Sequence, residues 1–496
     1  MDAPAPARGN YWRQQIENAL LAPIRAMRLA YLPLLMVYFA YGATGLTAVA
    51  QTFWVKRDLA FTPTDLATLS VWLALPWTVK MVFGELVDTV PLLGSQRRSY
   101  VFVGAALIGV SFVLLAGAAG NWFPWVRADT LFVVASLLTV IGVVLQDVVA
   151  DAMSTEVVAR VNPDGSPRAK AEIDHDLGMV QVLGRLALGF GIFSVAGLSG
   201  WLAQIVSYQA VFLWGLVVPL VSISGALLVS LEAHEQRPTD WRILGGGIAY
   251  GAVVVALGLS SLPGNQEIVF VISMTVVLLM LRRVAGEIEE STRIRMVYAA
   301  IIIFTFRCTP SVGEGYRWFT IDVLGFDEAF YGILQQLGAT IAIVAAWMFS
   351  DVVTRKPVAQ VLLWITILGF VLSLPTVGLV MRLDQVTERL FGFGARSIAI
   401  FDAAATSPLD QLSMIPLLTL VAIYAPSGHR ATWFALMASL MNLALVAGAL
   451  LSKYLNQIFP VDRGEYGNLP ALVMVSLLIS LVLPLCAILL FGRRVR

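Results

Sequence analysis

Long apolar stretches separated by short charged segments run along nearly the whole chain. The hydrocarbon core of a bilayer is roughly 30 Å thick, and a helix crosses it in about 20 residues. Stretches of that length lie near residues 30–53, 65–88, 99–119, 129–153, 177–204, 207–231, 243–261, 266–284, 296–312, 327–350, 358–381, 397–424, 430–457 and 468–492. The pattern predicts an all-α polytopic membrane protein with about fourteen transmembrane helices.

Composition places the chain in lipid and argues against several functions. Only 13% of its residues are charged, against about 25% in soluble proteins. The net charge of +1 gives no argument for a nucleic-acid partner. Cys308 and Cys486 both lie in apolar stretches, so we expect no metal and no cofactor. The sequence has no GxxxxGKS/T phosphate loop, so we expect a protein that is not an enzyme and that uses an ion gradient rather than ATP.

Lys and Arg residues gather in the loops of one predicted side. These loops are 96–98, 160–170, 232–242, 282–295, 355–356, 428–430 and 493–496. The positive-inside rule makes this side cytoplasmic and places both termini there, although the opposite 382–396 stretch is also basic. The first 28 residues are polar and do not look like a cleaved signal. We therefore expect a bacterial inner membrane.

The second half of the chain repeats features of the first. After the second span, Asp88 precedes a tight basic turn, and Asp351 does the same at the matching position of the other half. Such a duplication predicts two six-helix bundles around a central pathway, which is the major-facilitator arrangement. We expect a cytoplasmic segment at 1–28, bundles at 29–231 and 293–492, a linker with two extra helices at 232–292 and a cytoplasmic tail at 493–496.

Two carboxylates lie near the end of the fourth span. Asp147 and Asp151 are four residues apart and share one helix face. Acids at membrane depth are costly and normally face a polar cavity or a cationic partner. Arg185 in the next span reaches a similar depth, and Lys80 in the second span either draws anions inward or pairs with neighbouring acids. We predict that these residues serve substrate or proton passage; solvated acids or a structural ion pair are the alternatives.

A second charged set lies in the other half. Arg307 is about eleven residues into its span, roughly 16 Å deep at about 1.5 Å per residue. An isolated guanidinium there costs at least about 2.5–3.5 kcal/mol. Asp410 reaches a similar depth from the opposite side and shares a helix face with Asp402. We predict an Arg307–Asp410 pair that a carboxylate-bearing substrate competes for while the acid takes a proton; a static ion pair is the alternative.

Uncharged polar groups and one charged loop complete the candidates. The candidate ligand contacts are Tyr38, Tyr41 and Thr44, which form a stripe on the first span, and Gln335 and Asn442 in the other half. Packing is the commoner role of such an aromatic stripe, and the amides either contact the ligand or hold helices together by hydrogen bonds. The predicted gating loop after the second span consists of Gly84, Glu85, Asp88, Arg97 and Arg98.

Five stretches resemble the folate–biopterin transporter family of the major facilitator superfamily. They are YFAYGATGLTAVAQTFWVKRDL (38–59), LALPWTVKMVFGELVD (73–88), DVVADAMSTEVV (147–158), CTPSVGEGYRWFTIDVLGF (308–326) and PLDQLSMIPLLTLVAIYAPSGHRATWFALMASLMN (408–442). The stretches span both halves in the order of the family. The chain departs from the family pattern at 315–318 and at 403–406, which bears on the substrate more than on the fold.

The resemblance implies uptake of a folate- or pterin-type organic anion by proton symport and alternating access. The partners are then the solute, a proton and the lipid bilayer. The alternatives are a permease of the same superfamily for another anionic solute, such as a muropeptide, an acyl-CoA or S-adenosylmethionine, and a non-transporting membrane assembly factor.

Overall fold

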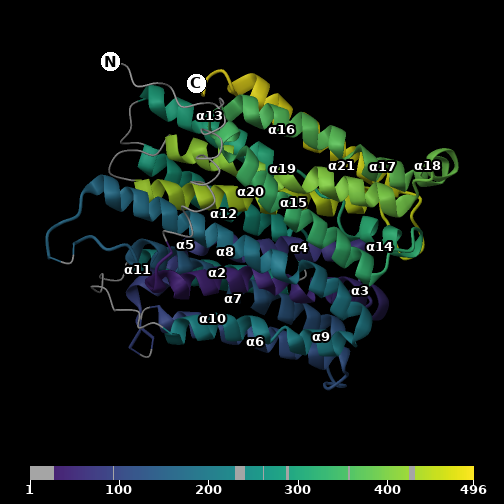
Figure 1. Ribbon diagram of the computed structural model, residues 1–496, viewed down its shortest axis with the longest axis horizontal. Coiled ribbons are helices and arrows are strands. Elements are labelled where there is room, and N and C mark those ends of the chain that lie inside the picture. Colours follow the sequence, from purple (N-terminus) through teal and green to yellow (C-terminus); the bar gives the residue numbers. More distant parts are fainter. Residues whose placement is uncertain are drawn as a thin grey trace, which may run out of the picture.

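The computed structural model describes most of the chain and is helical throughout the described part (Figure 1). The described residues are 27–92, 94–95, 97–162, 164–228, 241–260, 262–285, 290–355, 358–423 and 430–495. Within some helices only the backbone is described, as it is at Asp410.

The helices of the first part of the chain are η1 (Leu29–Tyr31), α2 (Leu32–Ala43), η2 (Thr44–Thr47), α3 (Ala48–Asp58), α4 (Pro63–Thr78), α5 (Lys80–Thr89), α6 (Arg98–Ala119), α7 (Ala128–Glu156), α8 (Lys170–Ile205), α9 (Tyr208–Trp214) and α10 (Val217–Leu228). Those that follow are α11 (Trp241–Leu259), α12 (Asn265–Ala285), α13 (Glu290–Arg307), α14 (Glu314–Asp322), α15 (Glu328–Arg355), α16 (Val358–Leu372), α17 (Leu374–Val380), α18 (Leu383–Phe391), α19 (Ala395–Ile423), α20 (Arg430–Ile458) and α21 (Leu469–Phe491).

Each predicted span falls on one of these helices or on consecutive ones. Within the described residues, ten helices are long and apolar enough to cross a membrane, and the bent pair Pro63–Thr78 and Val82–Thr89 would make eleven. The other three predicted spans correspond to α11, whose apolar stretch is short, and to α13 and α19, which carry charged residues among the apolar ones. The all-helical membrane fold is as the sequence predicts.

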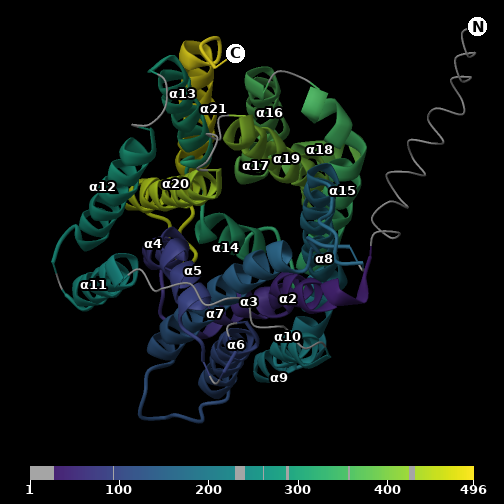
Figure 2. The same cartoon turned by 90° about the vertical axis from the view of Figure 1, so that its left-hand side faces the viewer.

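The helices pack in two sets with an additional pair at the edge. In one set α2 contacts α7, α8 and α10, and α6 contacts α7 and α9; in the other α15 contacts α19, and α13 contacts α20 and α21. The two sets meet through α8 with α15 and through α4 with α20. Figure 2 shows the helices nearly end-on, with α11 and α12 on the periphery beside α4, α5 and α20.

Two predicted spans are interrupted. The second span bends by 42° where α4 gives way to α5 at Val79, close after Pro76. The ninth, predicted as one stretch over 296–312, ends as a helix at Arg307. Pro310 explains that end, because proline lacks an N–H donor and disfavours helical geometry in the residue before it. The backbone N–H of Ser311 instead donates to the Ser452 hydroxyl at 2.8 Å.

Helices α2 and α8 approach so closely that glycine is required at their contact. A Cβ atom added to Gly42 or to Gly191 would lie within 3.0 Å of the partner helix's backbone, at Leu188 or Phe39 respectively. Small residues permit this kind of packing in lipid. The same test at Gly45, three residues further along, finds nothing nearer than 3.8 Å.

We therefore expect Gly42→Ala to lower the thermal stability of the purified protein and Gly45→Ala to leave it nearly unchanged. Overpacking a close contact costs about 1–3 kcal/mol, whereas alanine at Gly45 meets only an ordinary van der Waals contact. A thermal unfolding series in detergent measures both variants. Equal melting temperatures for the two would contradict the close approach at Gly42.

Candidate functional site

Lys80 lies between two carboxylates of a neighbouring helix. Its Nζ is 2.5 Å from Asp147 Oδ2 and 2.5 Å from Asp151 Oδ2. Lys80 is the first residue of α5, directly after the break in the second span, and the two acids are one turn apart on α7. The side chain of Asp147 is 13% exposed and that of Asp151 is 47% exposed. Asp151 is thus the member of this cluster that solvent or a solute reaches more easily.

The aromatic residues of α2 extend the cluster. The Tyr38 hydroxyl donates to Asp151 Oδ1 at 2.7 Å. Tyr41 stacks on Trp77, with ring centroids 6.0 Å apart and planes at 27°. Thr44, which was predicted as a ligand contact together with these two tyrosines, instead donates to the Tyr41 carbonyl at 2.6 Å, in the last turn of α2. Tyr38 and Tyr41 therefore border the charged cluster, while the Thr44 hydroxyl is occupied by backbone.

Arg185 is near the cluster but is not its ion-pair partner. Sequence reasoning proposed it as the partner of the α7 acids, yet Lys80 makes both ion pairs. Arg185 does lie near the acids, as its position along the span predicts. The sequence does not give the rotation of α8 about its axis, which decides where the side chain points. Arg185 is exposed and lies within electrostatic reach of Asp147, Tyr38 and Tyr41. Among the described side chains none forms an ion pair with it, so its guanidinium is available to an anion.

The charged candidates of the second half are only partly defined. Asp402 on α19 accepts a hydrogen bond from the Thr376 hydroxyl of α17 at 3.1 Å, and no cation of the described part of the chain pairs with it. Arg307 is the last residue of α13, which contacts α19. The side chain of Asp410 lies outside the described residues, so the Arg307–Asp410 pair stays a prediction.

The two uncharged amides differ in what they contact. Asn442 of α20 donates to the Trp77 carbonyl at 2.9 Å, one of the carbonyls at the break between α4 and α5. Asn442 thereby joins two helices. Gln335 makes no hydrogen bond with a described residue, while its neighbour Gln336 accepts one from the Gly197 N–H at 3.0 Å.

The loop after the second span forms a charged network around Arg97. Arg97 is bonded to Glu156 at 2.5 Å, to Asp88 at 2.7 Å and to the Val87 carbonyl at 2.9 Å. Its side chain is only 8% exposed. Arg98, predicted to belong to the same network, instead lies over the Phe102 ring at 5.7 Å. Gly84 and Glu85 lie on α5 before Asp88, and a Cβ at Gly84 would meet open space.

Comparison with known protein families shows to which family the chain belongs. The model of the BT1 family matches residues 42–495. The chain belongs to the BT1 family. A curated relative, the "Folate-biopterin transporter" of Synechocystis sp., is 26% identical over 92% of this chain and 80% of its own length. "Folate transporter 1" of Plasmodium falciparum is 20% identical over 90% of this chain and 76% of its own length. These matches confirm the family resemblance drawn from the sequence.

Solved structures give the fold of this BT1-family protein. A POT family transporter in complex with 5-aminolevulinic acid superposes with a TM-score of 0.68 at 14% identity, over 94% of this chain and 96% of the other. A POT family transporter bound to a thioalcohol-conjugated peptide gives a TM-score of 0.65 at 15% identity, over the same shares of each chain. The protein therefore has the major-facilitator fold. The family match and the transporter relatives make it a multi-pass membrane transporter rather than an enzyme.

One set of functional candidates in the BT1-family chain was missed from the sequence. At the end of α3, Lys56 pairs with Asp322, the last residue of α14, and Arg57 pairs with Glu328 of α15 at 2.8 Å. Arg463 adds hydrogen bonds to carbonyls of the loop after α3, including that of Phe61 at 3.3 Å. Among the ion pairs given by the described residues, only these two join the two helix sets. The repeat could have revealed them, because Lys56–Arg57 and 322–328 follow the first span of each half with opposite charge.

Proposed function

We propose that this BT1-family protein carries a folate- or pterin-type organic anion across the membrane by proton-coupled alternating access. The relatives are named for folate and biopterin. The observation that carries the proposal is the Lys80–Asp147–Asp151 cluster beside Arg185, which forms no ion pair with any described side chain. The names of these relatives supply the substrate class. The cluster supplies cations that attract an anionic solute and a carboxylate that takes up a proton.

Charge balance links solute and proton in this mechanism. Lys80 and Arg185 together neutralise Asp147 and Asp151, so the cluster with all four groups ionised is neutral. An incoming carboxylate that binds Arg185 adds one negative charge at membrane depth, where unbalanced charge is costly. One proton on Asp151, the more exposed acid, restores neutrality. Solute and proton then cross together.

Alternating access requires the two helix sets to move relative to one another. We assign these sets to the bundles at 29–231 and 293–492, with 232–292 as a linker and both termini on the cytoplasmic side of a bacterial inner membrane. Ion pairs between the sets at the end of α3 hold one face closed. The break between α4 and α5 lets the segment that carries Lys80 tilt as the bundles move.

Ligand binding tests the substrate. At 100 times its dissociation constant, a ligand stabilises the folded protein by about 2.7 kcal/mol. We expect folate or biopterin to raise the melting temperature of the purified protein, and Arg185→Gln to lose this shift. Arg295→Gln, an exposed arginine of α13, is the matched control and should retain it. If a muropeptide, an acyl-CoA or S-adenosylmethionine raised the melting temperature and no pterin did, the proposed substrate would be wrong, while the fold would be unaffected.

Uptake into proteoliposomes tests the coupling. An inward proton gradient should accelerate uptake by the wild type, and Asp151→Asn should transport without responding to the gradient. Asp462→Asn, in an exposed loop, is the control and should respond normally. If Asp151→Asn kept the full response to the gradient, the proton would have to bind elsewhere.

A further inference from the structure

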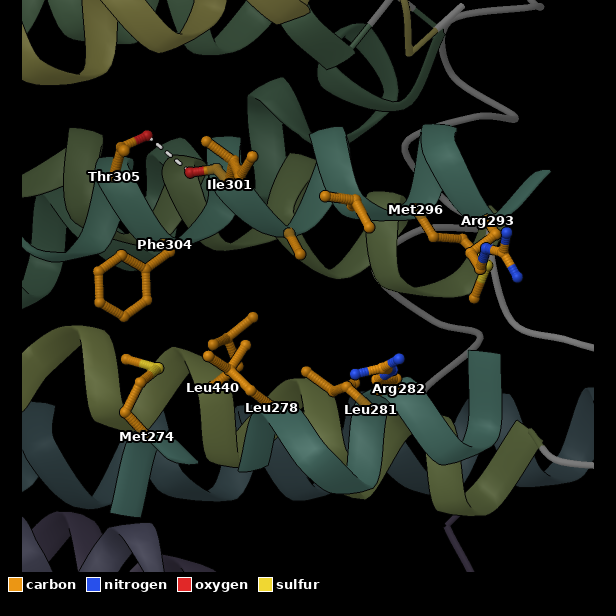
Figure 3. Close-up of a pocket in the computed structure, with 12 residues that line it drawn as sticks. Met274, Leu278, Leu281, Arg282, Arg293, Met296, Ile301, Phe304, Thr305 and Leu440 are labelled. Atoms are coloured by element: carbon orange, nitrogen blue, oxygen red, sulfur yellow. Dashed lines mark hydrogen bonds between the residues drawn. The ribbon is translucent and has the colours of Figure 1, made fainter. Parts of the chain in front are cut away.

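A groove between α12, α13 and α20 takes no part in the proposed transport site. Its volume is about 660 Å³. Apolar side chains make up most of its walls, among them Met274 and Leu278 of α12, Phe304 and Ala300 of α13, and Leu440 of α20 (Figure 3). The Thr305 hydroxyl in the wall donates to the Ile301 carbonyl at 2.8 Å and is therefore already occupied.

The charged residues of the groove lie at one end. Arg282 of α12 and Arg293 of α13 lie opposite each other there, and Met274, Phe304 and Thr305 mark the other end (Figure 3). Arg282 is exposed and forms no ion pair within the described part of the chain. Arg293 comes only within 3.9 Å of Glu290, whose side chain is 79% exposed. Among the described residues, the two guanidinium groups are thus only weakly compensated, and they open onto an apolar groove.

The groove is as deep as one leaflet. Arg293 and Phe304 are eleven residues apart on α13, which corresponds to about 16 Å along the helix at about 1.5 Å per residue. Half of a hydrocarbon core roughly 30 Å thick is about 15 Å. An occupant that fills the groove has an anionic head at the membrane surface and an apolar tail that reaches the midplane.

We propose that this groove binds an anionic phospholipid from the leaflet that adjoins Arg282 and Arg293. The two guanidinium groups hold its phosphate, for which their planar, multiple donors are suited, and an acyl chain lies between α12 and α13. Basic pockets between transmembrane helices are known to bind such headgroups. The bound lipid then fastens the peripheral helix α12 to the second helix set. By the predicted orientation the leaflet is the cytoplasmic one.

The test compares lipids on the full-length purified protein in neutral detergent. We expect dioleoylphosphatidylglycerol to be retained in native mass spectrometry and to raise the melting temperature more than dioleoylphosphatidylcholine, which has the same acyl chains. Glycerol 3-phosphate, which offers the phosphate without the chains, should give no shift. Equal effects of the two lipids, or a full effect of glycerol 3-phosphate, would overturn the proposal.

Five variants, four single and one double, locate the site. Arg282→Gln and Arg293→Gln should each weaken phosphatidylglycerol binding about fivefold, and the double variant about 25-fold, if each arginine contributes about 1 kcal/mol. Arg295→Gln, which changes the same charge on α13 outside the groove, should bind as the wild type does. Ala300→Phe fills the groove and should weaken binding with both arginines intact. If Arg295→Gln matched Arg293→Gln, or if Ala300→Phe had no effect, the lipid would bind by surface charge alone and the groove would not be its site.

Discussion

Replacing Lys80 by methionine should reduce uptake about 100-fold. The substitution leaves Asp147 and Asp151 facing each other without the ammonium that lies 2.5 Å from both. Removing one partner of a buried ion pair costs about 3–5 kcal/mol, and we take about 3 kcal/mol because Asp151 is partly exposed. When this cost falls on the solute-bound state of the cluster, it lowers uptake by roughly a factor of 100. Without Lys80, Arg185 alone faces the two carboxylates, and the uncompensated negative charge opposes the entry of an anionic solute.

Lys453→Met is the control for this prediction. Lys453 forms a single ion pair with Glu267 at 2.7 Å, and its side chain is 12% exposed. The change of charge and of side chain is identical, but the pair lies outside the cluster. Initial uptake rates in proteoliposomes, normalised to inserted protein, measure both variants. If Lys80→Met transported as fast as Lys453→Met, the Lys80 cluster would be a structural feature and not part of the pathway.

Arg97→Ala should destabilise the protein by about 3 kcal/mol, whereas Arg98→Ala should cost less than about 1 kcal/mol. Arg97 is 8% exposed and is bonded to Glu156, Asp88 and the Val87 carbonyl. Its removal therefore leaves the largely buried Glu156 carboxylate and the Val87 carbonyl without this partner. Among the described residues, the Arg98 side chain makes only the contact with the Phe102 ring, which is worth about 0.5–1 kcal/mol at an exposed site. Its buried Nε has no hydrogen-bond partner among the described residues.

Thermal unfolding of the two variants, side by side in one detergent, measures this difference. The two residues are neighbours of the same type in a loop that sequence alone treats as one unit. Similar melting temperatures for the two variants would show that the Arg97 network does not hold the loop.

The sequence predicted the helices and the location of the charged cluster for a physical reason. Apolar runs long enough to cross a bilayer have few alternatives, and Asp147 and Asp151 are conspicuous because charge at membrane depth needs a partner. The sequence does not show which cation is that partner. Lys80 and Arg185 both lie at a suitable depth, and only the rotation of each helix about its axis decides which of them faces the acids.

Other details depended on local geometry that periodicity does not contain. Thr44 begins the 3-10 segment η2. The prediction that its hydroxyl lies on the same face as Tyr38 and Tyr41 assumed a regular α-helix, and that assumption fails here. Arg97 and Arg98 are adjacent, and consecutive helical side chains point in different directions. Pro310 indicates the end of α13, but the apolar residues around it favoured one continuous span over 296–312.

The ion pairs at the end of α3 make this face of the protein sensitive to the ionic strength of the medium. Arg57 is 50% exposed and Asp322 is 32% exposed, so dissolved ions screen their attraction, over a Debye length of about 8 Å at physiological salt. Within the central cluster, the side chains of Lys80 and Asp147 are only 24% and 13% exposed, so their ion pair is screened less than Arg57 and Asp322 are. Raising the salt on this face alone therefore lowers the barrier to opening it without weakening the central cluster, so the two compartments need not affect the transport cycle equally.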